Sequence, residues 1–311
     1  RVLFRSVTSY VYSSVNQQEI ARWFAVAPFG VTLVFLLCSL RPPRMLFNPV
    51  RPWLYLLILG LITIFASGFR NVLLQALVAL GLAAWFHRGW RELALGALCG
   101  LVLLGAVIAG QGRLYELPLP AQRALSWLPG KWDSVVVEDA TNSSQGRFRW
   151  WQDVIRFKVI KNWWAGDGFG MSVRDFEAFQ RSQDFEGFMT AVGGFHNGPL
   201  TGIRSVGVIG LLLFYFLIIA TAVTAVRCVN RCRGTVLFPT AIFLAVQIVW
   251  FPVSYTLVFG DYSSQLPTTI MLQAFLVLVI RMLGELPQEQ PVAAPAVKAR
   301  SFSPARTRLP A

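Results

Sequence analysis

Apolar residues in this chain are gathered into seven long blocks, each close to the length of a helix that crosses a bilayer. Such a helix needs about 20 mostly apolar residues. The blocks cover residues 22–40, 52–67, 71–87, 92–110, 200–226, 236–258 and 266–284. Only residues 67–70 separate the short second and third blocks, which indicates a tight hairpin; a kinked or re-entrant piece is the alternative for either one. The pattern predicts an all-α polytopic membrane protein with about seven transmembrane helices.

The composition favours a membrane protein over a soluble one. Of the 311 residues, 55% are hydrophobic and only 14% are charged. The helices of soluble proteins usually carry a polar face, whereas these blocks are apolar all round. Burial in a large soluble core therefore explains the blocks poorly.

Lysine and arginine are distributed so that one orientation in the membrane is favoured. Short cytoplasmic loops carry an excess of both residues. The basic residues that flank the blocks on one side are Arg41, Arg44, Arg51, Arg88, Arg91, Arg227, Arg231, Arg233, Lys298, Arg300, Arg306 and Arg308. We expect their four segments to lie in the cytoplasm, so residues 111–199 must form one large periplasmic loop.

This orientation divides the chain into five parts. The two outermost parts are an extracytoplasmic N-terminal segment at residues 1–21 and a disordered basic cytoplasmic tail at residues 285–311. Between them lie a four-span bundle at 22–110, the large loop at 111–199 and a three-span bundle at 200–284.

The net charge of +13 does not indicate a nucleic-acid-binding protein. Basic and acidic residues are about equally numerous in the large loop, so the excess positive charge lies mostly at the cytoplasmic face. Membrane lipids are the expected partners there. Cys228 and Cys232 are one helical turn apart, but no second pair of ligands is nearby, so we expect no metal site.

The large loop contains a predicted amphipathic helix at residues 147–164. The residues at helical spacing are Phe148, Trp151, Ile155 and Val159. Tryptophan is common at membrane interfaces, so these aromatic residues indicate anchoring at least as well as a function. The glycines within residues 166–170 favour a tight turn that ends the helix.

One histidine and four arginines are candidates for chemistry on this side of the membrane. His196 lies directly before a predicted span and can titrate near neutral pH; packing at the start of that helix is an equal alternative. The arginines are Arg70, Arg147, Arg149 and Arg204. Guanidinium groups suit phosphate, so a lipid-linked phosphate or pyrophosphate is a reasonable ligand, with ordinary lipid headgroups as the alternative.

Four elements occur in an order that resembles one family. They are Ser67-Gly68-Phe69-Arg70, Arg147 with Trp151, Gly166-Asp167-Gly168-Phe169-Gly170, and His196-Asn197. The set is similar to the Ser-x-x-Arg, Arg-x-x-x-Trp, Gly-x-Gly-x-Gly and His-Asn elements of the O-antigen ligase and Wzy-type polymerase superfamily. The resemblance covers most of residues 52–226 and implies a GT-C-like fold with interfacial helices in the periplasmic loop. Members usually have more spans, so the chain resembles the C-terminal portion of such a protein.

The resemblance implies transfer of an undecaprenyl-pyrophosphate-linked glycan to an acceptor hydroxyl at the periplasmic face of the inner membrane. The acceptor would be lipid A-core, another glycan or a protein, and the displacement would be inverting, independent of metal and without a cofactor. Arg70 and Arg147 would hold the pyrophosphate, and His196 would act as general base. The implied substrate contacts are Arg149, Trp151, Asn197, Ser67, Gly168 and Gly170. Phe69 and Asp167 depart from the family pattern or vary within it, so neither is assigned a role.

Other functions remain open at this point. A polymerase of the Wzy type would carry the same elements, and the spacing of the loop does not distinguish it from a ligase. A transporter of lipid-linked or anionic solutes is a further alternative, although the spans contain few ionisable residues and no evident inverted repeat. A third alternative is a membrane scaffold without catalytic activity whose loop binds partners. The positions of the histidine and the arginines would then have no functional meaning.

Overall fold

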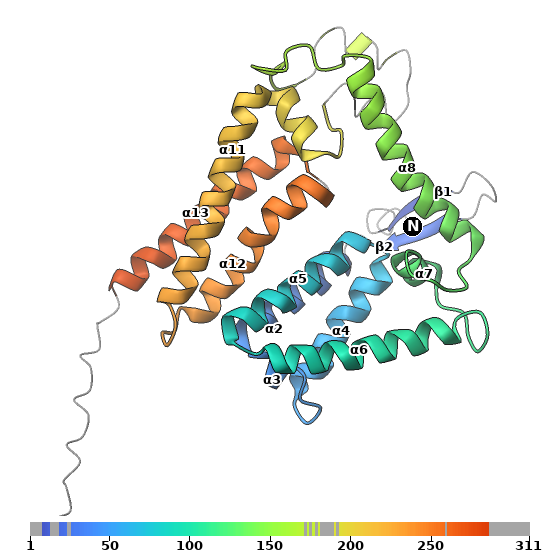
Figure 1. Cartoon of the computed structure of the whole chain (residues 1–311), viewed down its shortest axis with the longest axis vertical. Coiled ribbons are helices and arrows are strands. Elements are labelled where there is room, and N and C mark those ends of the chain that lie inside the picture. The colour runs from blue at the N-terminus through green and yellow to red at the C-terminus, as the bar shows by residue number, and fades with distance from the viewer. Residues whose placement is uncertain are drawn as a thin grey trace, which may run out of the picture.

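The structure, a computed structural model, describes residues 8–12, 19–23, 26–170, 173, 176–177, 180, 190, 193–258 and 260–285. The described chain is mostly helical (Figure 1). The helices are α2 (Val26–Leu40), α3 (Pro43–Leu46), α4 (Pro52–Ser67), α5 (Arg70–His87), α6 (Trp90–Gly110), α7 (Leu119–Leu125), α8 (Ser134–Arg156), α11 (Gly198–Arg231), α12 (Phe238–Val253), the π-helix η1 (Ser254–Val258) and α13 (Tyr262–Glu285).

Four of these helices are long and apolar enough to cross a membrane. They are α6, α11, α12 continued by η1, and α13. The shorter helices α2 and α4 are also apolar, but they have only 15 and 16 residues. The chain is therefore a mainly helical membrane protein. A helix occupies each of the seven predicted blocks, although only these four satisfy the length and hydropathy of a full span by themselves.

A short antiparallel hairpin precedes the helices and was not predicted from the sequence. β1 (Thr8–Tyr12) pairs with β2 (Glu19–Trp23), and Thr8 lies opposite Trp23. β-branched and aromatic residues in Thr-Ser-Tyr-Val-Tyr favour an extended backbone over a helix. The first apolar helix consequently begins at Val26 instead of residue 22.

The main core is formed where α2 packs against α4, α5 and α12. Gly30 and Gly60 let α2 and α4 approach closely, because a Cβ atom at Gly30 would lie 2.5 Å from Oγ1 of Thr63. In Figure 1, α11, α12 and α13 form a second group beside this core, and α7 and α8 lie at its other end. The start of α5, with Arg70, therefore lies beside α7 and α8.

The helix α6 buries little of its apolar surface. Leu101, Val102 and Leu103 are each about two-thirds exposed. The helix touches the rest of the protein near its first half, where Phe47 packs on Gly96. In a membrane protein such a surface faces lipid tails or other spans.

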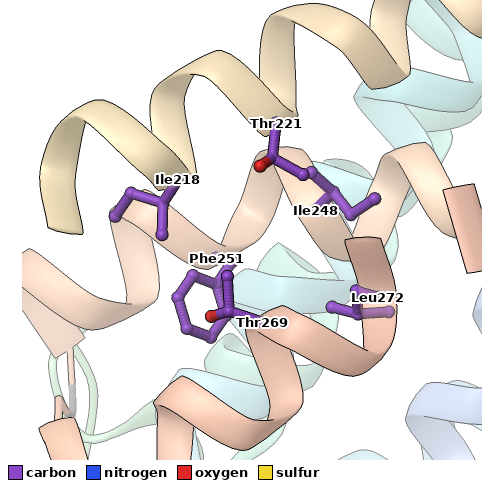
Figure 2. Close-up of a pocket in the computed structure, with 6 residues that line it drawn as sticks. All are labelled: Ile218, Thr221, Ile248, Phe251, Thr269 and Leu272. Atoms are coloured by element: carbon purple, nitrogen blue, oxygen red, sulfur yellow. The ribbon is translucent and has the colours of Figure 1, made fainter. Parts of the chain in front are cut away.

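A void of about 10 Å³ lies between α11, α12 and α13 (Figure 2). It is lined by Ile218, Thr221, Ile248, Phe251, Thr269 and Leu272. The hydroxyls of Thr221 and Thr269 donate to backbone carbonyls of their own helices. A space of this size holds about one water molecule, so the substrate-binding region must lie elsewhere.

Candidate functional site

The hairpin between α4 and α5 presents Arg70. Ser67 is fully buried, and its hydroxyl donates to the carbonyl of Ile64 at 2.6 Å, which closes the last turn of α4. Gly68 then adopts a left-handed conformation (φ 73°), as a residue that ends a helix often does. Arg70 is the first residue of α5, and its Nη2 donates to the carbonyl of Ala140 in α8 at 3.3 Å.

Arg123 of α7 joins the same hairpin to α8. Its guanidinium is buried, forms an ion pair with Asp139 at 2.5 Å, and donates through Nη1 to the carbonyl of Gly68 at 2.8 Å. A buried guanidinium needs several partners to offset its lost hydration. Arg123 therefore fixes the tip of the hairpin against the first half of α8.

The helix α8 differs from the predicted amphipathic helix in both bounds. It begins at Ser134, where the Asp133 carboxylate accepts from the N–H of Val135 at 2.9 Å, and it ends at Arg156. Val159 therefore lies beyond the helix, although it still packs in an apolar cluster with Val154 and Phe195. The interval between the observed and predicted starts consists of three valines followed by a mostly polar run at 138–146, a pattern without helical spacing that hid its helical character.

One face of α8 carries Arg147 toward the hairpin. Ala140 and Val154 are buried on this helix, and each is seven residues from Arg147, which puts all three on one face. Burial, and then the charge of Arg123, lower the pKa of Arg147. Burial also lowers the pKa of Arg70; Arg123 and Arg147 lower it further, whereas Asp139 raises it. Three guanidinium groups and one carboxylate thus share a partly buried region that favours a multivalent anion.

His196 lies directly before α11, near enough to Arg147 for its charge to act on the imidazole. It is half-buried and adopts a left-handed backbone with φ 51°, and its ring meets the ring of Trp150 edge-on at 6.0 Å. Burial lowers the pKa of His196, and the nearby charge of Arg147 lowers it further. Asp261 acts in the opposite direction and raises it. The surroundings therefore favour the neutral imidazole.

Hydrogen bonds on both sides of His196 hold it in place. The indole N–H of Trp151 donates to the carbonyl of Phe195 at 2.8 Å. Asn197 is the N-cap of α11, and its side-chain oxygen accepts from the N–H of Leu200 at 3.0 Å. The predicted residues Trp151 and Asn197 therefore make contacts that orient His196.

The glycine-rich turn is docked on α11 by Arg204. Its buried guanidinium donates to the carbonyl of Gly168 at 2.7 Å and to that of Gly170 at 3.1 Å. Both glycines have positive φ angles, 84° and 91°. The carboxylate of Asp167 closes the turn by accepting from two backbone N–H groups, those of Lys161 and Asn162.

A kink in α11 receives this turn. Gly207 interrupts the helix with φ 70° and ψ 178°, and the N–H of Val208 donates to the carbonyl of Trp163 at 2.8 Å. A Cβ atom at Gly207 would lie 2.0 Å from the carbonyl oxygen of Trp164. Only glycine permits this close approach in this conformation.

The segment after η1 brings Asp261 to the site. Tyr255 is fully buried and its hydroxyl donates to the carbonyl of Gly198 at 2.6 Å. The N–H of Tyr262 donates to Oγ1 of Thr201 at 3.2 Å. These two bonds tie η1 and the start of α13 to the first turn of α11, and Asp261 lies between them, near enough to His196 for its charge to act there.

Among the predicted residues, Arg147 lies near enough to Arg70 and to His196 for its charge to act on both. Arg149 is exposed on α8. The remaining predicted residues are held in internal hydrogen bonds: Trp151, Asn197, Ser67, Gly168 and Gly170.

Sequence reasoning missed Arg123, Asp139 and Asp261. Arg123 is the one basic residue within Leu119–Leu125, in a mostly apolar segment, and such a residue needs a partner when it is buried. Asp261 lies between the apolar blocks 236–258 and 266–284, whose other ends carry basic segments, so the distribution of charge predicts the same side as the large loop. The sequence therefore singles out Arg123 and the side on which Asp261 lies, but it does not show that Arg123 pairs with Asp139 or that Asp261 acts on His196.

The family model described as O-antigen ligase matches residues 55–215, just over half of the chain. The chain belongs to the O-antigen ligase family. The match includes Arg70, Arg147 and His196, and it confirms the resemblance inferred from their motifs. Neither the curated proteins nor the solved structures contain a match.

Membership of the O-antigen ligase family gives the general activity. This protein is a membrane enzyme of the O-antigen ligase or polymerase type and resembles glycosyltransferases in its chemistry. Its substrates are a lipid-linked glycan and an acceptor. In this ligase family member, the cluster of Arg70, Arg123, Arg147 and His196 is the candidate place for that chemistry.

Proposed function

We propose that this protein transfers a glycan from undecaprenyl pyrophosphate to a hydroxyl of lipid A-core at the periplasmic face of the inner membrane. The observation that carries the proposal is that Arg147 lies near enough to both Arg70 and His196 for its charge to act on each, although the three come from separate segments. A pyrophosphate leaving group and a hydroxyl nucleophile require a cationic site beside a neutral base. This combination lies within the region that matches the family.

Arg70 and Arg147 bind the pyrophosphate in this proposal. Arg123 is engaged within the protein, because it pairs with Asp139 and donates to the carbonyl of Gly68. The charges of Arg123 and Arg147 disfavour the charged form of Arg70, and a pyrophosphate bound beside Arg70 and Arg147 relieves that repulsion. As the leaving group departs, the same donors stabilise the negative charge that develops on its oxygen.

His196 accepts the proton of the acceptor hydroxyl. Its lowered pKa keeps the imidazole neutral near pH 7, the form that a general base requires. The hydroxyl oxygen attacks the anomeric carbon from the face opposite the pyrophosphate, and the bond from that carbon to the pyrophosphate oxygen breaks. The anomeric configuration inverts, the proton resides on His196, and no step needs a metal or a cofactor.

The other predicted contacts have supporting roles. Arg149 and Trp151 meet the sugar from α8, whereas Ser67, Asn197, Gly168 and Gly170 shape the site through the hydrogen bonds that they make. We assign the seven apolar helices to seven spans, residues 111–199 to the periplasmic loop, and residues 285–311 to a cytoplasmic tail. The distribution of basic residues in the sequence supports this orientation.

Transfer by the full protein in lipid nanodiscs tests the proposal, with an undecaprenyl-pyrophosphate-linked glycan as donor and lipid A-core as acceptor. We expect His196→Ala to lower kcat/KM by about 10²–10⁴-fold, because a general base is lost. We expect Arg147→Ala to lower it by about 10²–10³-fold, because a donor to the leaving group is lost. Release of undecaprenyl pyrophosphate must fall in parallel.

Arg156→Ala is the matched control. Arg156 is an exposed arginine at the end of the same helix and lies over the ring of Phe157. Wild-type rates in the His196 and Arg147 variants would overturn the assignment. Elongation of the lipid-linked glycan without attachment to lipid A-core would make the protein a polymerase instead.

A further inference from the structure

A second cavity lies at the end of α5 that is remote from Arg70. It has a volume of about 370 Å³ and is lined by Pro42, Arg44, His87, Arg88, Gly89 and Glu92. Figure 1 shows α3 and the start of α6 meeting at this end of α5. An 18-residue helix extends about 26 Å along its axis, so this cavity is on the opposite face of the membrane bundle from the candidate site.

Two arginines from separate segments face the cavity. Arg44 comes from α3 and Arg88 follows the last residue of α5, and both are exposed. Within the part of the chain that the structure describes, neither side chain makes a hydrogen bond or an ion pair. With the carboxylate of Glu92, the lining carries a formal charge of +1, which matches one phosphodiester.

The backbone at Arg88 supports a role for its side chain. Arg88 ends α5 in the left-handed region with φ 57°, a position where glycine is preferred. The neighbouring Gly89 is buried against Pro43. The left-handed backbone is unfavourable for arginine, so its presence at this position favours a function for the guanidinium group, which glycine lacks.

Tryptophans indicate that the cavity lies at the level of lipid headgroups. Trp85 and Trp90 flank it in sequence and are 57% and 54% exposed. Exposed tryptophans gather at membrane–water interfaces, where their apolar ring and polar N–H are both accommodated. Close by, the guanidinium of Arg41 lies 4.6 Å from the ring centre of Trp53.

We propose that this cavity binds the phosphodiester headgroup of an anionic phospholipid. Arg44 and Arg88 hold the phosphate, and Glu92 limits the site to a singly charged group. The volume is within the range of small-ligand pockets, about 300–1,000 Å³. The site is separate from the glycan-transfer chemistry and does not depend on it.

Binding of phosphatidylglycerol to the full protein in zwitterionic detergent, measured by native mass spectrometry, tests this site. We expect Arg44→Ala and Arg88→Gly each to raise the Kd about fivefold, since each removes one basic contact near an anionic headgroup. Arg88→Gly keeps the left-handed backbone favourable, so folding is preserved. Glu92→Gln is expected to lower the Kd, because it removes a carboxylate whose negative charge repels the phosphate of the lipid.

Arg51→Ala serves as the control, since Arg51 is exposed at the start of α4 and does not line the cavity. A loss of binding in Arg51→Ala equal to that in Arg44→Ala would overturn the proposal in favour of diffuse surface charge. Weaker binding in Glu92→Gln would also contradict it. Binding of inorganic phosphate with the same affinity would assign the cavity to a free anion instead of a lipid.

Discussion

His196 combines an unusual backbone conformation with a shifted proton affinity. A positive φ at a residue with a side chain costs free energy, and the bonds made by Trp151 and Asn197 on either side maintain it. The imidazole packs edge-on against Trp150 and lies within range of the charge of Arg147. Its charge state then depends on Arg147 and Asp261, which act in opposite directions.

The pH dependence of transfer follows from these two charges. The pKa of His196 lies below its usual 6.5, so the neutral base persists at pH 6.5 and is lost only as the pH falls further. The carboxylate of Asp261 stabilises the protonated form of His196, so removal of this carboxylate lowers the pKa of His196 further. We therefore expect Asp261→Asn to shift the acidic limb of kcat/KM against pH to lower pH.

Asp153→Asn is the control for this profile, because Asp153 is an exposed acid on α8. Its profile should coincide with that of the unmodified protein. A limb that moves to higher pH in Asp261→Asn, or does not move, would contradict the proposed electrostatic relation between Asp261 and His196.

Arg123 illustrates a residue that matters to the site without binding substrate. Removal of one partner from a buried ion pair typically costs about 3–5 kcal/mol, because the other charge stays buried alone. Loss of Arg123 would also remove a donor to the carbonyl of Gly68 and so loosen the hairpin that carries Arg70. An inactive variant at this position therefore reports on positioning.

Two helices contribute most to the geometry of the site. The first half of α8 is a mostly polar run after three valines. Its helical structure depends on the packing of Val135 and Val136 against Leu119, on the Asp133 cap and on the ion pair of Asp139. The sequence pattern revealed only the second half. In α11, the kink at Gly207 is invisible to hydropathy, because the apolar pattern continues through it.

Substitution of Gly207 tests the docking of the glycine-rich turn. In Gly207→Ala the new Cβ collides with the carbonyl of Trp164, and the backbone at φ 70° and ψ 178° is itself unfavourable for alanine by about 1–3 kcal/mol. We expect the turn to detach, so that trypsin cleaves after the exposed Lys161 faster than in the unmodified protein.

Gly105→Ala provides the comparison, because Gly105 is within the helix α6 and a Cβ there meets no atom within 4 Å. Alanine favours a helix more than glycine, so cleavage should be unchanged. Equal cleavage of both variants would show that the kink does not hold the turn.

The molecule as a whole separates two regions along α5. Arg70 lies at one end of α5 with the candidate site. His87 lies at the other end, beside the cavity lined by Arg44 and Arg88. The exposed apolar surface of α6 extends along the same bundle. A membrane orientation that puts the two ends in different aqueous compartments is a direct consequence of the proposed topology.

Labelling with a membrane-impermeant maleimide tests that orientation. Asn142→Cys on α8 should react from the periplasm, and Arg231→Cys at the end of α11 should react only after the inner membrane is opened, since both positions are exposed. The parent should carry Cys99→Ser, because Cys99 is the exposed cysteine among the four. Reversed labelling would invert the topology.

The sequence by itself determined the apolar helices and the family, and it made Arg70, Arg147 and His196 the candidates for the site. Hydropathy and short motifs are local properties, so they can be read without knowledge of contacts. Only the tertiary structure decided that Arg123 pairs with Asp139 and that Asp261 acts on His196, because these residues are distant along the chain. Their partners are selected by how the helices pack, and a pattern within one segment carries no information about that packing.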